Sequence, residues 1–400
     1  MIDTLVSFAA RGLTQASWPA WITYFIVATQ LTIFSVTLYL HRSQTHRAVD
    51  FHPALAHVFR LWAWLSTAMV TKEWVAIHRK HHARCETEED PHSPLHKGIR
   101  KVVLDGVALY QQECKNPETM VKYGIGTPDD WIERNVYGRF PAVGPTLLLF
   151  VCIAMFGVVG VALWALQMVW IPFWAAGVVN GLGHWWGYRN FESADMSTNL
   201  TPWGLIIGGE ELHNNHHAFP SSAKFALRKF EVDIGWGAIR LFEAIGLAKV
   251  LRVAATLDVR PNVKLPDVET VKAVLSHRVH VLSDYFKGVI APTLRDEVGN
   301  AGVGLKALPR KLRKGLANGG RWLDAGSRRE LDAVVSERPL LATVCDFRAR
   351  LAGLLDRNGR NADAMMESLK QWCQEAEASG IRTLADFAGR LKGYQLAHSH

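Results

Sequence analysis

Two long segments of this chain carry no charged side chain, which restricts the folds that it can adopt. Residues 18–40 (WPAWITYFIVATQLTIFSVTLYL) contain no Asp, Glu, Lys or Arg, and neither do residues 141–188. About 20 apolar residues in a helix cross the core of a bilayer. We therefore expect membrane spans over about 18–40, 145–163 and 168–187, with a turn near Gln167. A single large buried core is the alternative, and the Trp and Tyr residues that flank these runs favour a membrane.

Eight histidines lie in three short clusters, or boxes, close to the apolar segments. The boxes are His41 and His46; His78, His81 and His82; and His213, His216 and His217. The second and third boxes share the spacing i, i+3, i+4, which places three imidazoles on one face of a helix. We therefore expect the three imidazoles of each of these boxes to converge on one point. In the first box, the two histidines are five positions apart, which is about 140° around an ideal helix. This box therefore needs either an irregular turn or two separate metals.

An isolated histidine is more often a hydrogen-bonded core residue than a ligand, and we interpret His52, His57, His277 and His280 in that way. Packing alone gives no reason for the same His-x-x-His-His pattern to occur at two distant sites. Imidazole is a suitable ligand for iron, zinc and copper. The boxes therefore predict a metal centre, and their number of ligands predicts two ions.

Residues 54–70 are also apolar, but His57 and Arg60 interrupt them. All three boxes must meet at one side of the membrane, so we predict an amphipathic helix at the interface here, not a span. The segment 84–139 carries eight Lys or Arg, whereas residues 1–17 carry only Arg11. By the positive-inside rule the boxes are expected in the cytoplasm. The predicted fold is all-α, with membrane helices and a cytoplasmic helical cap that holds the metals.

The chain divides by composition into residues 1–250 and a basic helical region over 265–400. Residues 1–250 hold 21 Lys or Arg against 20 Asp or Glu, and residues 251–400 hold 24 against 17. Every candidate ligand precedes residue 218, so we expect the C-terminal region to be separable from the metal chemistry. Its basic run over 306–314 is expected to be solvated or to contact anionic lipid head groups, and nucleic-acid binding is not expected. Five cysteines without a Cys-x-x-Cys pair indicate neither a disulfide framework nor an iron–sulfur cluster.

The boxes and their surroundings resemble a known family. The matching segments are HRSQTHR at 41–47, HRKHH at 78–82, DPH at 90–92, GHWWGYR at 183–189 and GEELHNNHHAFP at 209–220. Over roughly residues 20–250 this pattern resembles the membrane-bound fatty-acyl desaturases of the stearoyl-CoA desaturase-like family, especially the bacterial Δ9 members. The resemblance implies O₂-dependent desaturation of a saturated long-chain acyl group at Δ9, for membrane lipids, in a bacterial inner membrane.

The resemblance also implies a ligand set of nine histidines and one asparagine around two iron ions. His184 joins the eight box histidines, and Asn180 reaches a metal through water. Side chains cannot themselves oxidise an unactivated alkyl chain, which is why metals are needed. We expect Glu210, Glu73 and Asp90 to accept N–H groups of the ligands, and Glu86, Glu88 and Glu89 to belong to a solvated loop. Trp185, Trp186 and Tyr188 are expected either to line an acyl channel or to pack at the interface.

The sequence departs from the family next to the second box. Relatives that use acyl-CoA often have an Arg-Asp pair where this chain has Ala76-Ile77. This difference favours an acyl group on a phospholipid, although Arg79, Arg100 and Lys101 remain candidate contacts for CoA phosphates and both carriers stay open. The sequence has no cytochrome b5 or nucleotide-binding motif, so we expect an external donor such as a ferredoxin with an NAD(P)H reductase.

Two other functions fit a histidine-rich membrane protein. The first is a hydroxylase acting on alkanes, sterols or carotenoids with the same di-iron scaffold, which the product would distinguish because it would carry a hydroxyl group. The second is a metal transporter, which would need ligands inside several spans and a path through the protein, whereas these boxes lie at one end.

Overall fold

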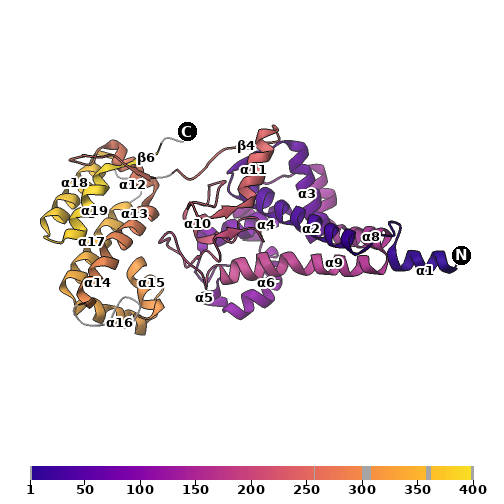
Figure 1. The fold of residues 1–400 in the computed structure, drawn as a ribbon, viewed down its shortest axis with the longest axis horizontal. Helices are drawn as coiled ribbons and strands as arrows, with labels where there is room; N and C mark the ends of the chain where they lie inside the picture. The colour runs from indigo at the N-terminus through magenta and orange to yellow at the C-terminus, as the bar shows by residue number, and fades with distance from the viewer. Residues whose placement is uncertain (1, 256, 300–307, 357–361, 398–400) are drawn as a thin grey trace. The chain divides into compact units, whose positions relative to one another are not determined.

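The computed structural model describes residues 2–255, 257–299, 308–356 and 362–397. The chain forms two compact units, which we call the first unit (residues 1–189 and 195–254) and the second unit (190–194 and 255–400). Both are mainly helical, as expected (Figure 1). The short segment 190–194 belongs to the second unit, although the residues on either side of it belong to the first. The sequence did not predict this.

The first unit consists of helices and three short pieces of strand pairing. Its helices are α1 (Ile2–Arg11), α2 (Trp18–Phe34), η1 (Ser35–Thr45), α3 (Pro53–Thr67), α4 (Thr71–Arg84), α5 (Pro94–Lys97), α6 (Ile99–Cys114), α7 (Pro117–Tyr123), η2 (Glu133–Tyr137), α8 (Val143–Phe156), α9 (Val158–Ile171), η3 (Pro172–Leu182), α10 (His213–Ala218) and α11 (Ile234–Ala244). Strand β1 (Val49–Phe51) pairs antiparallel with β4 (Ala248–Val250), and β2 (Trp203–Gly204) pairs parallel with β3 (Val232–Asp233). Tyr188 and Asn199 form an isolated bridge.

Two continuous helices of the first unit are long and apolar enough to cross a membrane. They are Trp18–Thr45, which joins α2 to η1, and Val158–Leu182, which joins α9 to η3. Large apolar side chains on α8 and α9 point outward, and Phe150 and Val169 are 63% and 65% exposed. An apolar surface of this kind needs a covering of lipid or protein, which is consistent with membrane association. Helices α8 and α9 run side by side (Figure 1).

The turn between these two helices lies at Gly157 and not near Gln167. Gly157 has a φ of +63°, and a Cβ there would lie 2.5 Å from the carbonyl oxygen of Ala9, so only glycine fits. Gln167 is inside α9 and 4% exposed. The helices therefore run over 143–156 and 158–182, in place of the predicted 145–163 and 168–187. Gln167 was misleading because it is a polar residue in an apolar run, but neighbouring helices bury it.

The expected helix over 54–70 is present as α3. It begins at Pro53, where the side chain of His52 accepts a hydrogen bond from the backbone N–H of Ala54, and it ends where Ala68 takes a left-handed conformation. Arg60 is 7% exposed and donates to Asp130 Oδ2 at 2.7 Å. The charge that interrupts the apolar run is therefore neutralised inside the protein.

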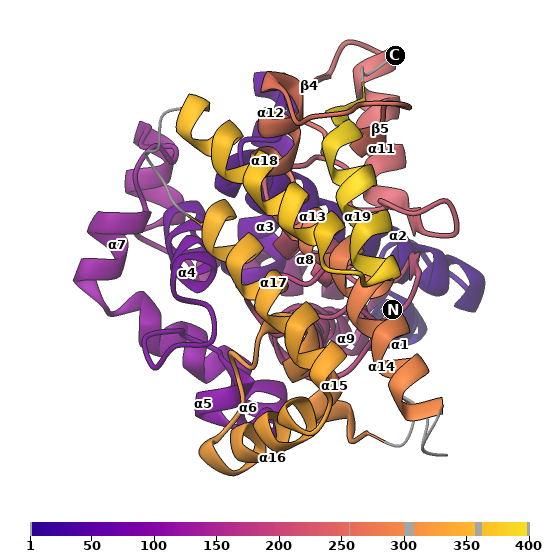
Figure 2. The same cartoon turned by 90° about the vertical axis from the view of Figure 1, so that its left-hand side faces the viewer.

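The second unit is a helical assembly with its own apolar core. Its elements are β5 (Leu257–Val259), α12 (Val268–Ser276), α13 (Arg278–Tyr285), η4 (Phe286–Ile290), α14 (Ala291–Gly299), α15 (Arg310–Asn318), α16 (Ala325–Ser336), α17 (Pro339–Leu355), α18 (Ala362–Ala378), α19 (Arg382–Gly393) and β6 (Tyr394–Leu396), which pairs antiparallel with β5. Helices α18 and α19 lie next to each other (Figure 2), and Trp372 and Phe387 are among the residues fully buried between the helices.

The basic run predicted over 306–314 falls partly outside the described residues, because Lys306 and Ala307 are not described. The remainder forms most of α15. Leu312 and Leu316 of this helix are buried in the core of the second unit, and Lys311 pairs with Asp324. One face of α15 is therefore structural, which leaves its charged face for solvent or a partner.

Candidate metal centre

The first box lies on a π-helical turn, which is the irregular turn that its spacing required. Within η1, the backbone N–H of His46 donates to the carbonyl of His41 at 3.1 Å, and Thr45 Oγ1 donates to Leu40 O at 2.9 Å. A π-helix has hydrogen bonds between residues five apart. In such a helix, residues five apart share one face, so both histidines of the box point toward the same place. They lie in one group, so the alternative of two separate metals for this box does not apply.

Five imidazoles from all three boxes converge in what we call the first histidine group. It contains His41, His46, His78, His82 and His216, and each offers a nitrogen within 4.8 Å of the others. The Nε2 atom of His41 lies 2.9 Å from the Nε2 atoms of both His78 and His216. Helices η1, α4 and α10 thus each direct ligands to one point.

The remaining histidines form a second histidine group beside the first. His81, His184 and His217 approach one another together with Cys85, again within 4.8 Å. His213 joins them, because its Nε2 atom lies 2.9 Å from that of His184. The structure therefore brings His184, which follows η3, to the boxes, and every histidine predicted as a ligand lies in one of the two groups.

The two groups have the properties of cation sites. Burial, followed by the neighbouring imidazoles, holds the pKa values of His46, His82 and His216 well below the ordinary value, so these rings are neutral near pH 7. The Nε2 atoms of His46 and His217 are buried and have no hydrogen-bond partner among the described residues. Two nitrogen lone pairs that face each other without a shared proton repel, whereas two nitrogens that bind the same metal ion, each at about 2.1 Å, can lie about 3 Å apart. The observed contacts fit bound metal ions.

Four carboxylates orient the imidazoles from outside. Each accepts a hydrogen bond from Nδ1 of one ring: Glu210 from His41 (2.8 Å), Asp90 from His81 (2.9 Å), Glu86 from His184 (2.8 Å) and Asp195 from His217 (3.0 Å). A proton fixed on Nδ1 leaves the lone pair on Nε2, directed toward the group, and raises the basicity of the ligand. These carboxylates therefore select the tautomer that binds a metal.

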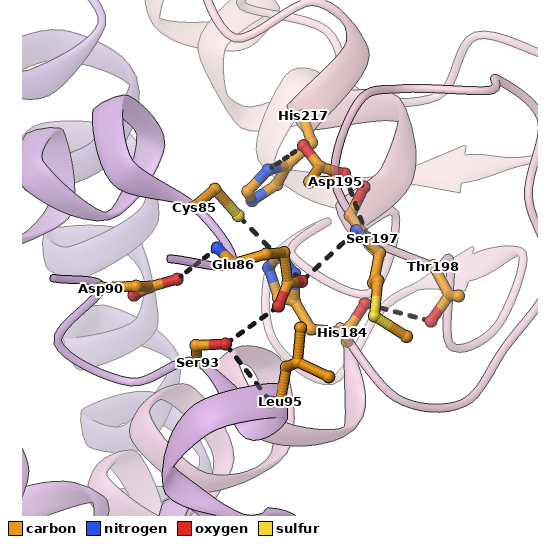
Figure 3. Close-up of polar contacts among 12 residues, drawn as sticks. Cys85, Glu86, Asp90, Ser93, Leu95, His184, Asp195, Ser197, Thr198 and His217 are labelled. Atoms are coloured by element: carbon orange, nitrogen blue, oxygen red, sulfur yellow. Dashed lines mark hydrogen bonds and ion pairs between the residues drawn. The ribbon is translucent and has the colours of Figure 1, made fainter. Parts of the chain in front are cut away.

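Glu86 does not belong to a solvated loop, and that prediction was wrong. Its residue is 2% exposed, and its carboxylate accepts from His184 Nδ1 and from Ser93 Oγ (Figure 3). Burial alone would raise the pKa of Glu86, but the hydrogen bonds from His184 and Ser93 lower it. The chain turns sharply after α4, where Glu86 has a φ of +61° and donates its N–H to Asp90 Oδ2. This turn carries Glu86 inward, whereas Glu88 and Glu89 are exposed.

Of the three acidic residues predicted to accept N–H groups of the ligands, two contact imidazoles and one does not. Asp90 and Glu210 lie against imidazoles, in agreement with the expected role. Glu73 is on the wall of a cavity near Cys114, and no hydrogen bond joins it to an imidazole in the described part of the chain. Asp195 was not predicted, because a single acid in the loop between His184 and the third box has no spacing that marks it.

A cavity of about 600 Å³ opens beside the histidines. Its walls come from η1, α4, α6 and η3, and they are mostly apolar. His41, His78 and His213 face this cavity, and so does Asn180, the predicted water-mediated ligand. The cavity therefore brings an apolar ligand next to both histidine groups.

The predicted channel residues do not line this cavity. Trp185 and Trp186 are 48% and 58% exposed, and the hydroxyl of Tyr188 donates to Glu231 Oε1 at 2.8 Å. None of the three is among the described residues of the cavity wall, which instead includes Trp74. The interface alternative remains for the two tryptophans.

Arg79 is one candidate contact for CoA phosphates, but its guanidinium already donates hydrogen bonds to backbone carbonyls. Its guanidinium donates to the carbonyls of Thr45 (3.2 Å), Tyr123 (3.0 Å), Ile125 (2.7 Å) and Gln44 (2.8 Å). Arg100 and Lys101 are exposed and lie outside the described cavity wall. Among the described lining residues, Lys115 is the one with a cationic side chain.

A buried arginine connects the first box to the segment after the third. Arg42 is fully buried and forms an ion pair with Asp233 at 3.0 Å, and both side chains are 0% exposed. It also donates to the carbonyls of Ala223 and Gly208, and its guanidinium lies 3.8 Å from the ring centre of Phe225, which packs against His216. Arg42 therefore fixes the surroundings of the first histidine group.

Replacing Arg42 with methionine is expected to lower the free energy of unfolding by about 3–5 kcal/mol, because it leaves the Asp233 carboxylate buried without its cation. Thermal unfolding of the purified protein in detergent measures this effect. The control is Arg240→Met, since the exposed Arg240–Glu243 pair contributes only about 0–1 kcal/mol. Equal stabilities of the two variants would show that Arg42 has no such role.

Comparisons with known proteins agree in the type of protein that they indicate. A sequence model of the family described as "Fatty acid desaturase" matches residues 16–235, which is more than half of the chain. The Arabidopsis thaliana protein named "Probable lipid desaturase ADS3.2, chloroplastic" is 31% identical over 279 residues, covering 66% of this chain and 71% of that protein. "Icosanoyl-CoA 5-desaturase" of Limnanthes douglasii is 30% identical over 274 residues, covering 66% and 70%. The Arabidopsis "Palmitoyl-monogalactosyldiacylglycerol delta-7 desaturase, chloroplastic" is 27% identical, covering 58% and 62%.

Proposed function

Because this chain belongs to the fatty acid desaturase family, we propose that it introduces one double bond at the Δ9 position of a saturated long-chain acyl group of membrane lipids. The observation that carries this proposal is the apolar cavity against which both histidine groups lie. An acyl chain in this cavity would have its C–H bonds next to the metals. The proposed location is a bacterial inner membrane, with the boxes on the cytoplasmic side.

The proposed cofactor is a pair of iron ions. His41, His46, His78, His82 and His216 would hold one ion, and His81, His184, His213 and His217 would hold the other, with Asn180 acting through water. The ions would supply the oxidising power that no side chain has. The protein binds and orients the chain, and the carboxylates Glu210, Asp90, Glu86 and Asp195 keep a proton on Nδ1 of their imidazoles.

The overall reaction balances with an external electron donor. Two C–H bonds break, one C=C bond forms, and the acyl chain gives up two electrons and two protons. Reduction of O₂ to two waters takes four electrons and four protons, so two further electrons and two protons are required. We propose that a ferredoxin-like protein with an NAD(P)H reductase supplies these electrons, since acidic donors of this kind dock on cationic surfaces.

The acyl carrier is proposed to be a membrane lipid. A CoA head group brings several phosphate charges, which require cationic side chains at the entrance. Ala76 and Ile77 are buried and apolar, Arg79 is committed to carbonyls, and Lys115 alone contributes a cation to the described cavity wall. One relative is named for an acyl-CoA substrate and another for a galactolipid substrate, so both carriers occur in the names of similar proteins.

Expression in a host that lacks desaturases, followed by lipid analysis, tests the proposed reaction. We expect monounsaturated acyl chains with the double bond at Δ9 and no added hydroxyl group. Hydroxylated chains would instead identify the hydroxylase, and a double bond elsewhere would overturn the Δ9 assignment. An unchanged lipid profile with the donor supplied would overturn desaturation of these lipids.

Labelled substrates are expected to identify the carrier. Membranes with acyl transfer blocked should desaturate labelled phospholipid at least about tenfold faster than labelled acyl-CoA, because one cation offers little binding to the CoA phosphates. Lys115→Met should change the rate with phospholipid less than about threefold, as should the control Lys101→Met. Rapid desaturation of the intact CoA thioester, lost in Lys115→Met and kept in Lys101→Met, would reverse this assignment.

A further inference from the structure

Between His184 and the third box, the chain leaves the first unit for five residues. Residues 190–194 belong to the second unit, whereas Arg189 and Asp195 on either side belong to the first. We call residues 190–194 the strap. The two units are thus joined covalently at both ends of the strap as well as at residues 254 and 255. The second unit therefore includes residues from the middle of the chain as well as its C-terminal part.

The second unit holds the strap along its length. Hydrogen bonds join the two at the start, the middle and the end of the strap. Lys287 Nζ donates to Asn190 O (3.0 Å), and the N–H of Glu192 donates to Ser283 Oγ (2.6 Å). Trp322 Nε1 donates to Ala194 O (2.7 Å). Phe191 is 2% exposed, and its ring meets that of His280 edge-on at 5.5 Å. The residues that hold the strap come from α13, η4 and the segment after α15, so several elements of the second unit fix it.

The residues that follow the strap lie against the second histidine group. Asp195 Oδ2 accepts from His217 Nδ1 at 3.0 Å, and the N–H of Met196 donates to Glu86 Oε1 at 3.3 Å, the same oxygen that accepts from His184 (Figure 3). Asp195 is bonded directly to Ala194, the last residue of the strap. The position of Ala194 therefore limits where the Asp195 carboxylate can lie.

We propose that the second unit positions the second histidine group by holding the strap, which fixes Asp195 and Met196 and through them His217 and His184. This inference rests on the proposed function, because it takes the histidines to be iron ligands. A surface loop without such anchors samples many conformations, and a hydrogen bond weakens steeply when its geometry is lost. Ser283, Lys287 and Trp322 are thus positioning residues for a metal that none of them contacts.

The inference reverses the expectation that the C-terminal region is separable from the metal chemistry. Every candidate ligand does precede residue 218, but Trp322 and the helices that hold the strap come later in the sequence. Changes in the second unit would then reach the iron without altering a ligand. Any partner that binds the second unit would have a route to the metal centre through the strap.

Iron release from the purified full-length holoprotein into excess chelator tests the proposal. The strap variant combines Ser283→Ala, Lys287→Met and Trp322→Phe. We expect one of two iron ions to leave about tenfold faster than in the unchanged protein, since loss of a group that orients a ligand costs about 10–100-fold in metal affinity. The other ion should leave at its usual rate, because the hydrogen bonds of Asp195 and Met196 lead to ligands of the second histidine group.

The control variant removes hydrogen bonds of the same kind from the second unit without touching the strap. Trp372 Nε1 donates to Phe347 O at 3.1 Å and Tyr285 Oη donates to Val344 O at 2.7 Å, so Trp372→Phe with Tyr285→Phe is matched to the strap variant. We expect iron release from this control within about twofold of the unchanged protein. Equal acceleration of iron release in the two variants would overturn the proposal, because it would show that any destabilisation of the second unit has this effect.

Asp195→Asn completes the test. Because one of the two routes from the strap passes through Asp195, this substitution should accelerate release of the same iron ion, and the strap variant should accelerate release less when added to Asp195→Asn than when made alone. Additive effects, or no effect of the strap variant, would overturn the inference while leaving the di-iron proposal intact. Trp322→Phe alone serves in the same assay if the triple variant does not fold. An unchanged protein that is active without iron would overturn the proposed function itself.

Discussion

Replacing His81 with alanine is expected to abolish product formation, by at least about 100-fold, while the protein still inserts in the membrane. His81 is fully buried in the second histidine group, and its Nδ1–H donates to Asp90 Oδ1, with 2.9 Å between the two atoms. Loss of a group that merely orients a ligand costs about 10–100-fold, and loss of the ligand itself should cost more. Product formation in membranes from a host that lacks desaturases measures the effect, with the amount of inserted protein as reference.

The matched control for this variant is His57→Ala. His57 is exposed on α3 and belongs to neither histidine group, so the expectation that it is a core residue was wrong, as it was for the exposed His52. The loss of His57 should leave the activity within about twofold. Activity of the His81 variant similar to that of the control would exclude His81 as an iron ligand.

Glu86→Gln is expected to weaken iron binding by about 10–100-fold, whereas Glu88→Gln should have no effect. The two residues are two positions apart, but Glu86 accepts from His184 Nδ1 at 2.8 Å and Glu88 is exposed. An amide can still accept one hydrogen bond, but it lacks the charge that supports the imidazole. Iron titration of the apoprotein gives both affinities. Equal affinities would show that the buried carboxylate does not tune the site.

The histidine boxes could be predicted because the spacing of residues within one helix determines which side chains share a face. The i, i+3, i+4 pattern predicted one helix face for each of the second and third boxes, and these faces meet in the structure. The expectation that each box converges on one point was wrong, because each box divides its imidazoles between the two groups: His81 of the second box and His213 and His217 of the third lie in the second group. The first box allowed two solutions, since the sequence does not reveal whether hydrogen bonds between residues five apart will form. The π-helical turn at His41 and His46 depends on packing around η1, where nearly all residues are buried.

The positions that could not be predicted depend on partners far away in the sequence. In the sequence, Glu86 cannot be distinguished from its exposed neighbours Glu88 and Glu89. Its role depends on a hydrogen bond from His184, which is 98 residues later in the chain. Asp195 carries no periodic signal, and the strap before it is held by residues from 283 to 322. Gly157 is one of several glycines in an uncharged run, and its close contact with α1 appears only when the helices pack. Spacing within one element is therefore informative, whereas burial of a single acid or glycine requires the tertiary structure.

The iron content of the purified, active protein tests the central claim most directly. The two histidine groups, with five and four imidazoles in separate clusters, predict two iron ions per chain, measured by elemental analysis alongside the specific activity of the same sample. A fully active preparation with one iron ion per chain, or with none, would contradict the account.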